Sequence, residues 1–437
     1  MTKQDELVAH PVFGEGVVQA SRWDGAELKV RFRSGLQLWL PAKWFRPVTI
    51  KHVPLNVISS KRLLEAFRLG IVPHQDIEYF TFGRAFELSE LDDGLRRLKQ
   101  GKGDVYLVEG GYGSGKTHLL EYLHHLSIRY GFVTTYCELS VQETPLYRPK
   151  RIYRELVHNL RYIRENSEYR FRDLLKAVAP LKIRDHCFLT PVLGYLRNLE
   201  DGDSNNEVFW QWVEGESTKE YAIDPLSPFR VRGGQKIPAL YDYSTATDYY
   251  SFLLSGLSYL AHEAGLGGLV IILDEVETIT HMWDYVSYTR GLNFLEGLIQ
   301  SALNNDSLKK IENRMLHNRV RPTPYIYKEP HLLLILASTP IHGLRGFEGV
   351  REMIQKRVVL RRFSNPELEL IYRNLYDVYV CAYPEFALLV AQKENILNAA
   401  LKRSFGELRE FIKFSVEAFD WYRHSRPRNT RTTNASA

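Results

Sequence analysis

The sequence has few cysteines and no long apolar run. Its 437 residues include three cysteines, far apart and without a C-x-x-C pair. This scarcity excludes a disulfide framework and a zinc ribbon and favours a reducing, cytoplasmic compartment. His124 and His125 have no carboxylate or cysteine that completes a metal site, so we expect them to be packed or solvated. The most apolar stretches, Gly268–Leu273 and Leu332–Ala337, are too short to span a bilayer.

Neither sign of charge dominates the chain. It has 57 Lys and Arg against 52 Asp and Glu, a formal net charge of +5 and a pI near 8.8. This small excess permits contact with nucleic acid but does not require it. The first ten residues have no basic segment leading into an apolar one, so we expect no secretory signal. A hydrophobic fraction of 44% and this length indicate a globular chain of two or three domains.

The first fifty residues have the pattern of short strands. Apolar and polar side chains alternate in Ala26–Phe32 and in Leu36–Leu40. The dipeptides Asp24-Gly25 and Ser34-Gly35 supply turns between such strands. We expect a small β-barrel in residues 1–50.

A phosphate-binding loop is the clearest motif. Gly110–Thr117, with the letters GGYGSGKT, matches G-x-x-x-x-G-K-[ST]. The loop follows the apolar run Val105–Glu109 and precedes a helical stripe of leucines, the strand–loop–helix order of a parallel sheet. Lys116 is expected to contact the β- and γ-phosphates of ATP, and the Thr117 hydroxyl to bind Mg²⁺. The rest of the loop would bind phosphate through its backbone, at Gly110, Gly111, Tyr112, Gly113, Ser114 and Gly115.

A second, acidic motif completes the expected site. Leu269–Leu273 is typical of a buried central strand, and Asp274 and Glu275 follow at its carboxyl end, where ligands bind in open α/β sheets. We expect Asp274 to hold Mg²⁺ and Glu275 to orient or deprotonate the attacking water, which favours hydrolysis over mere binding. The separation from Lys116 to Asp274 is 274 − 116 = 158 residues, so an insertion is expected between them.

These motifs predict an α/β organisation. Residues 81–363 would form a parallel-sheet P-loop NTPase of AAA+-like type, with a largely helical insertion at about 148–263. Residues 51–80 would form a linker and a helix. A helical lid is expected at 364–424, followed by a basic, disordered tail at 425–437.

The order of these motifs resembles that of AAA+ ATPases, which implies three further site residues. In that group a third apolar strand ends in a polar residue that senses the γ-phosphate; Thr339 fits best and Ser338 is the alternative. An arginine before a short strand reaches a neighbouring subunit's nucleotide, and Arg357 resembles it, with Arg351 as the alternative. In the lid, Arg409 resembles an arginine that touches the γ-phosphate.

Most of the chain, from about Asn56 to Ala418, more specifically resembles the ATP-binding family of BREX-type phage-defence islands, the BrxD group. The resemblance implies an AAA+-like or initiator-like ATPase whose partners are DNA and other defence proteins, including a helicase. It is carried by the stretches SSKRLLEAFRLGIVP, FGRAFELSELDDGL, VEGGYGSGKTHLLEYL, LYRPKRIYREL, FWQWVEGE and VIILDEVETI.

The N-terminal segment HPVFGEGVVQASRWDGAELKVRFRSGLQLWLPAKWF is similar to the small Tudor-like barrel of UvrD/PcrA-type helicases. That resemblance implies binding to nucleic acid, to RNA polymerase or to another protein. Lys29, Arg31 and Arg33, with Trp39 and Trp44 nearby, suit a nucleic-acid backbone, or they form a solvated face beside core tryptophans. This barrel is not expected in most of the ATPase family, so a related defence or repair island stays open.

Two functions follow from these patterns. The first is a Mg²⁺-dependent ATPase of an anti-phage system, an oligomer that acts on double-stranded DNA with partner proteins. The alternative is a non-hydrolysing, nucleotide-gated scaffold or DNA-binding adaptor that assembles defence proteins. A nuclease or methyltransferase finds no supporting motif.

Overall fold

The fold was obtained as a computed structural model that describes residues 7–10, 14–32, 36–47, 56–73, 77–81, 84–181, 183–198, 206–216, 236–241, 246–282, 284–309, 323–340, 345–404 and 407–425. The chain divides into two compact units, which are described separately. The first comprises Met1–Leu88, Gly111–Tyr122 and Leu360–Ala437; the second comprises Ser89–Gly110 and Leu123–Val359. The expected tail after residue 425, Arg33 and the turn at Ser34-Gly35 lie outside the described residues.

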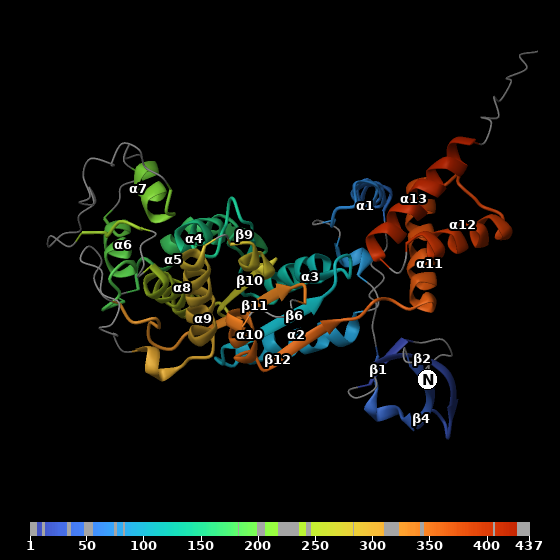
Figure 1. The fold of residues 1–437 in the computed structure, drawn as a ribbon, viewed down its shortest axis with the longest axis horizontal. Coiled ribbons are helices and arrows are strands. Elements are labelled where there is room, and N and C mark those ends of the chain that lie inside the picture. Colours follow the sequence, from blue (N-terminus) through green and yellow to red (C-terminus); the bar gives the residue numbers. More distant parts are fainter. Residues whose placement is uncertain are drawn as a thin grey trace, which may run out of the picture. The chain divides into compact units, whose positions relative to one another are not determined.

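A seven-stranded, mostly parallel sheet forms the centre of the second unit (Figure 1). Its order is β12-β6-β11-β10-β7-β8-β9, and β6, β11, β10 and β7 pair in parallel. Every residue of β6, β10 and β11 is buried, as expected for central strands covered on both faces. The strands are β6 (Asp104–Gly110), β7 (Val133–Glu138), β8 (Arg161–Arg164), β9 (Ser167–Arg170), β10 (Leu269–Asp274), β11 (Leu332–Ser338) and β12 (Lys356–Leu360). The α/β fold and its main strands are therefore confirmed.

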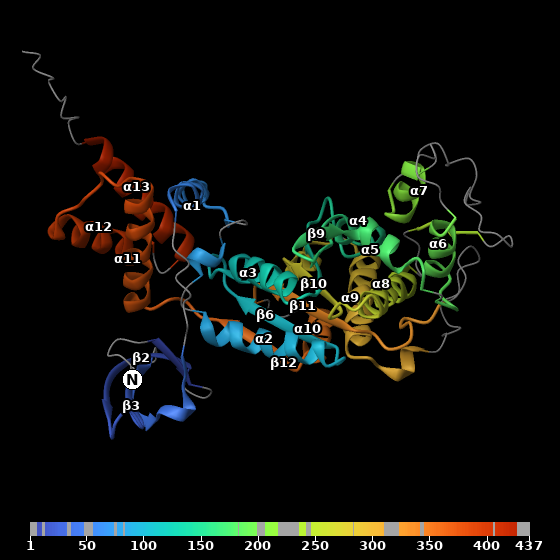
Figure 2. The same ribbon diagram turned by 180° about the vertical axis from the view of Figure 1, so that it is seen from behind.

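Helices pack around this sheet and beyond its β9 end (Figure 2). They are α2 (Ala85–Lys99), α4 (Pro149–His158), α5 (Phe171–Val178), α6 (Leu189–Leu196), α7 (Asn206–Val213), α8 (Ala246–Glu263), α9 (Tyr285–Ala302) and α10 (Arg345–Glu352). Helices α4 to α8 belong to the expected insertion and share one continuous apolar core with the sheet. No described helix is long and apolar enough to cross a membrane.

The insertion also contains a β-hairpin, which the prediction of a largely helical segment missed. Strands β8 and β9 pair antiparallel, and β8 pairs with β7, so the hairpin extends the central sheet. Its two-residue turn has Glu165 at φ 52° and Asn166 at φ 61°, the positive values of a type I′ turn. Tyr162 and Tyr169 stack across the strands at 5.5 Å between ring centroids. Strands of only four residues with mostly polar side chains give little periodicity to detect.

Four helices of the first unit share a second core. They are α1 (Val57–Leu69), α11 (Asn365–Ala382), α12 (Val390–Arg403) and α13 (Leu408–Ser425). Helix α1 begins at the N-cap Asn56 and ends at Gly70, whose φ of 68° suits a glycine. A helix was expected between residues 51 and 80, beside a linker; its packing on α11 and α13 was not, and Arg68 binds Asp420 at 2.7 Å.

The N-terminal strands form an antiparallel sheet in the order β4-β3-β2-β1-β5. The strands are β1 (Leu7–His10), β2 (Gly14–Arg22), β3 (Glu27–Phe32), β4 (Gln37–Pro41) and β5 (Arg46–Pro47). Their core contains Val8, Val18, Leu28, Val30, Phe32 and Phe45. Gly16 lies so close to β3 that an added Cβ would clash with the Val30 side chain, which explains one glycine of the quoted segment. That these strands close into a Tudor-like barrel stays a prediction.

Candidate nucleotide-binding site

The phosphate loop runs from the end of β6 to the start of α3 (Lys116–Arg129). Gly113 and Gly115 have φ values of 70° and 91°, in the left-handed region that residues with a Cβ adopt at a cost of about 1–2 kcal/mol. The Ser114 N–H donates to the Gly111 carbonyl at 3.2 Å, and the Lys116 Nζ lies 3.5 Å from the same oxygen. The lysine side chain therefore folds back over the loop, at the helix N-terminus that suits a phosphate.

A buried arginine anchors this loop, and sequence analysis did not identify it. Arg84 is 4% exposed, and its Nη2 donates to the Ser114 carbonyl at 2.7 Å. Its Nη1 donates to the Glu87 carboxylate at 2.9 Å, and its guanidinium lies 4.2 Å from the centre of the Phe363 ring. A charge-assisted hydrogen bond thus fixes one carbonyl of the loop. The residues lie in the stretch FGRAFEL, which contributed only to the family resemblance.

A neutral histidine lies behind the same loop, on the first turn of α3. The Nε2 of His118 is 3.0 Å from the Thr81 hydroxyl. Burial, and then the charge of Arg84, lower the pKa of His118 to about 4. The side chain is therefore uncharged at neutral pH and adds no repulsion to the buried arginine.

The lid arginine proposed from the sequence contacts the phosphate loop. The Arg409 Nη1 donates to the Tyr112 hydroxyl at 3.1 Å, and its guanidinium lies 5.5 Å from that ring's centre. Both residues belong to the first unit, and Tyr112 is 71% exposed. An added Cβ at Gly113 would lie 3.5 Å from Glu407, one residue before α13, so this helix end is close to the loop. Gly406, which was expected to start the helix, lies outside the described residues.

Asp274 is held rigidly at the end of β10. It is 1% exposed; its Oδ2 accepts a 2.9 Å hydrogen bond from the Tyr136 hydroxyl, and its Oδ1 accepts one from the Glu275 N–H at 2.9 Å. Glu275 has φ 60° and ψ 38°, a left-handed conformation that is uncommon outside glycine and often stores strain at functional sites. Tyr136 on β7 is a second residue that sequence analysis missed, because its partner lies 138 positions away.

Three parallel strands bring the predicted motifs to one edge of the sheet. β6 pairs with β11, and β11 pairs with β10, so the carboxyl ends of these strands lie at the same edge of the sheet. The phosphate loop follows β6, Thr339 follows β11, and Asp274 is the last residue of β10. Ser338 is 1% exposed and donates through Oγ to the Thr339 carbonyl at 2.9 Å. Thr339 is half-buried just beyond the strand.

A family model described as "BREX system ATP-binding protein BrxC/D" matches residues 57–180 and 187–421. The chain belongs to this family. The match leaves the N-terminal sheet outside it. No curated protein matches this chain.

Similar solved structures include the Orc1 protein of Aeropyrum pernix in complex with DNA, at 13% identity and a TM-score of 0.39. That match covers 82% of this chain and 65% of the Orc1 chain, so the chain spans less than two thirds of that protein. A Walker-type ATPase of Pyrococcus abyssi has 13% identity and a TM-score of 0.39. That match covers 78% of this chain and 68% of the ATPase chain.

The two candidate finger arginines of this BrxC/D-family chain are both engaged within the second unit. Arg351, on α10, binds the Glu109 carboxylate through Nε at 2.7 Å and Nη2 at 2.9 Å. Glu109 is 5% exposed and lies directly before the phosphate loop. Arg357 was expected before a short strand, but it is the second residue of β12 and donates to the Arg351 carbonyl at 3.0 Å. Both contacts lie within this chain, and the finger assignment stays a prediction.

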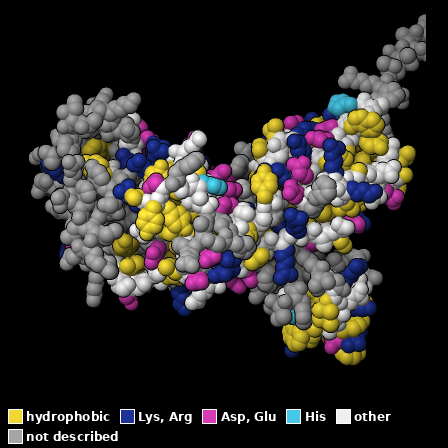
Figure 3. All heavy atoms as spheres, in the orientation of Figure 1, with side chains coloured by type: hydrophobic (Ala, Val, Ile, Leu, Met, Phe, Trp, Pro, Cys, Tyr) yellow, Lys and Arg dark blue, Asp and Glu magenta, His cyan; other side chains and the backbone are white. Residues whose placement is uncertain are grey.

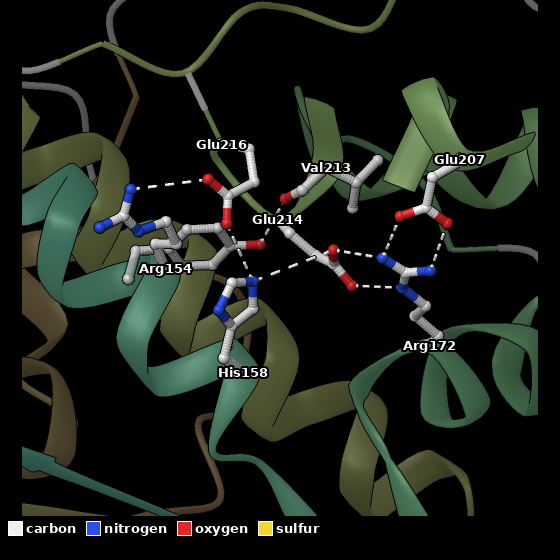
Figure 4. A network of polar contacts seen from close by, with 8 residues as sticks. Arg154, His158, Arg172, Glu207, Val213, Glu214 and Glu216 are labelled. Atoms are coloured by element: carbon white, nitrogen blue, oxygen red, sulfur yellow. Dashed lines mark hydrogen bonds and ion pairs between the residues drawn. The ribbon is translucent and has the colours of Figure 1, made fainter. Parts of the chain in front are cut away.

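The FWQWVEGE stretch, which carries part of the family resemblance, is structural (Figure 4). Trp210 and Trp212 are buried in the insertion core, and the Trp212 Nε1 donates to the Pro238 carbonyl. Glu214, just after α7, receives two hydrogen bonds from Arg172 of α5, at 2.6 and 2.8 Å. Arg172 also donates twice to Glu207 of α7, at 2.8 and 2.9 Å.

Helix α4 completes this network from the other side (Figure 4). His158 Nε2 lies 3.4 Å from Glu216, and Arg154 lies 3.5 Å from the same carboxylate. The Tyr153 hydroxyl donates to the Val213 carbonyl at 3.1 Å. The conspicuous residues of the insertion therefore fasten α7 to α4 and α5.

Helix α3 also corrects the expectation for its paired histidines. Glu121 lies one turn before them, and its carboxylate and the nitrogens of His124 and His125 lie within 4.8 Å of one another. A carboxylate that the sequence pattern did not reveal is thus present on the same helix. His124 is 8% exposed and faces the Tyr136 ring at 6.3 Å, as a packed histidine would.

Proposed function

We propose that this chain binds ATP with Mg²⁺ and hydrolyses it in a bacterial anti-phage defence system. The observation that carries the proposal is the acidic pair at the end of β10. Asp274 is buried and fixed by two hydrogen bonds, and Glu275 next to it has a left-handed backbone, at the sheet edge where β6 enters the phosphate loop. Rigid placement of a carboxylate and a strained neighbour suits chemistry better than passive binding.

The residues present fit the predicted ATP and Mg²⁺. Carboxylate and hydroxyl oxygens are the donors that Mg²⁺ takes in phosphate sites, and Asp274 and Thr117 supply them. The metal would neutralise charge on the β- and γ-phosphates. Lys116 would bind the phosphates and Glu275 would orient the water. Thr339 would sense the γ-phosphate, and Arg409 would contact it from the lid.

The biological setting follows from the family. Membership of the BREX ATP-binding group supports a role beside other defence proteins, and the resemblance supports DNA and a helicase as partners. We propose that hydrolysis is coupled to double-stranded DNA, in an oligomer in which Arg357 or Arg351 acts on a neighbour's nucleotide.

The deciding measurement is ATP hydrolysis by the purified chain with and without double-stranded DNA. Lys116→Ala is expected to abolish turnover because the phosphates lose their cation. Lys402→Ala, at an exposed position on α12, is the matched control and should behave as wild type. Turnover that persists in Lys116→Ala, or that ignores DNA, would contradict the proposal.

One observation favours a second candidate, a nucleotide-gated scaffold. Arg351 is bound to Glu109, and Arg357 to a backbone carbonyl, so both candidate finger arginines have partners in their own chain. A subunit without an available finger would bind ATP and not turn it over. Glu275→Gln separates the two functions, because a motor would lose turnover and defence while keeping ATP, whereas a scaffold would lose neither assembly nor defence.

A further inference from the structure

The outer face of the N-terminal sheet carries basic and aromatic side chains together. Three residues of β3 enter the core, while Lys29 and Arg31 between them point outward. The β3–β4 register places Trp39 directly opposite Lys29. Trp39 is therefore an outward residue, which decides against its being a core tryptophan.

A second tryptophan lies at the tip of the β2–β3 hairpin. Trp23 is 67% exposed and has φ 51°, a strained conformation for a bulky aromatic residue. The Arg22 guanidinium lies 4.5 Å from the ring centres of both Trp23 and Trp39, and Glu27 binds this arginine at 2.6 Å. The turn thus presents an indole that gains little from core packing and is available to a ligand.

The charge of this segment identifies the kind of ligand. Residues 7–47 contain six basic residues and three acidic ones, so their formal charge is 6 − 3 = +3. Figure 3 shows hydrophobic side chains beside Lys and Arg over these strands. A positive surface with flat aromatic rings suits a polyanion that carries flat apolar groups, which is single-stranded nucleic acid.

We propose that this face, formed by Arg22, Trp23, Lys29, Arg31 and Trp39, binds single-stranded nucleic acid without sequence preference. Bases stack on the two indoles, and phosphates lie beside Lys29 and Arg31. A duplex keeps its bases stacked inside and offers these rings only its backbone, so unpaired strands are preferred. The inference rests on the proposed action on DNA, and it adds that this face contacts DNA in single-stranded form.

The test measures binding of the full chain to a labelled oligothymidylate of about 20 nucleotides and to a duplex of the same length. Trp23→Ala and Trp39→Ala should each weaken single-strand binding by about tenfold, since stacking on one aromatic ring contributes roughly that factor. Trp44→Ala is the matched control, because Trp44 is 47% exposed but lies in the short helix Ala42–Trp44 after β4. Trp23→Phe and Trp39→Phe keep a ring and should retain most of the affinity.

The cations are tested through salt dependence. Lys29→Glu with Arg31→Glu should reduce the slope of log affinity against log salt by about 1.4, at roughly 0.7 for each phosphate contact in single strands. Lys43→Glu, an exposed lysine of the same helix as Trp44, is the control. Unchanged binding in the tryptophan variants, equal binding of duplex, or no binding of either would overturn the proposal. An acidic protein that competes for these residues while oligonucleotides do not would assign the face to a protein partner.

Hydrolysis of ATP separates this inference from the proposed function. The Trp23→Ala, Trp39→Ala double variant should hydrolyse ATP at the wild-type rate in the absence of nucleic acid, which also shows that it is folded. Lys116→Ala should lose turnover and keep oligonucleotide binding. Wild-type turnover without oligonucleotide binding would refute only the binding face; binding without turnover would refute only the ATPase.

Discussion

The two units each contain an arginine held by glutamate, but they use the pair differently. In the first unit, Arg84 divides its bonds between Glu87 and the Ser114 carbonyl of the phosphate loop. In the second unit, the side chain of Arg172 donates its four hydrogen bonds to two carboxylates, Glu207 and Glu214 (Figure 4). The side chain of Arg84 is 4% exposed and that of Arg172 is 37% exposed.

This difference separates two roles of an arginine: positioning a binding site and joining helices. An arginine that uses carboxylates alone joins helices to one another, and its removal should change stability without reaching the nucleotide. An arginine that holds a backbone carbonyl of the phosphate loop fixes the N–H groups on the other side of those peptides. Arg84 is therefore expected to act on ATP affinity as a positioning residue, which sequence patterns for direct contact residues do not reveal.

The largest effect is expected from Arg84→Met. It leaves the Glu87 carboxylate buried without its cation, which costs about 3–5 kcal/mol of unfolding free energy. Denaturation in urea measures this loss. The double variant Arg84→Met, Glu87→Leu removes both charges and should recover most of the stability, yet its ATP affinity should stay reduced because the loop has lost its anchor. Recovery of affinity together with stability would show that Arg84 has no positioning role.

Low pH tests the same comparison at two histidines, His118 of the first unit and His186 of the second. Burial lowers the pKa of His118 to about 4 and that of His186, beside Phe252, to about 3. Both values lie below the unfolded value of about 6.5, so each neutral imidazole stabilises the fold above that pH, and the stability is lost as pH falls. At pH 5 each histidine should account for about 2 kcal/mol of lost unfolding free energy.

Replacing either histidine by phenylalanine should flatten the pH dependence of unfolding below pH 6.5. His118→Phe should do so with a change in ATP affinity, since His118 lies on the first turn of α3. His186→Phe should do so without one. A pH profile that neither variant changes would contradict the neutral state of these side chains.

The main sheet and the direct-contact motifs could be predicted because their signals are local. A continuous apolar run predicts a buried strand, and the spacing of glycines, Lys116 and Thr117 is short enough to read in one segment. Arg84 and Tyr136 could not be predicted, since their partners Ser114 and Asp274 lie 30 and 138 positions away. No pattern of residue types marks such a distant pair.

The hairpin β8–β9 and the packing of the expected helix α1 were missed for a different reason. The hairpin β8–β9 has mostly polar side chains, so its alternation is weak, and only its two tyrosines mark it. Helix α1 is amphipathic, but an apolar stripe does not say which partner covers it, and its packing on α11 and α13 needs the fold.

A smaller effect is expected in the insertion. Arg172→Met should lower the unfolding free energy by about 1–2 kcal/mol, less than at Arg84, because Arg172 is more than a third exposed and solvent screens its charge. ATP affinity, measured by titration calorimetry, should stay at the wild-type value. Arg161→Met is the control: its described ion pair is with the single, 53% exposed carboxylate of Glu168, so its loss should cost less than about 1 kcal/mol. A fall in ATP affinity in Arg172→Met would mean that the insertion does more than fasten helices.

The smallest structural change is Tyr136→Phe, which removes one hydroxyl from Asp274 and nothing else. A hydrogen bond to a charged group contributes about 1.5–3 kcal/mol, but water can replace part of it, so about 1 kcal/mol of stability should be lost. The Asp274 carboxylate loses one of its two described supports, so the Mg²⁺ concentration for half-maximal hydrolysis should rise and turnover should fall by about tenfold. ATP affinity measured without Mg²⁺ should not change. Tyr169→Phe, on the hairpin, should leave both quantities unaltered. An unchanged Mg²⁺ requirement in Tyr136→Phe would mean that Asp274 is positioned by its backbone alone.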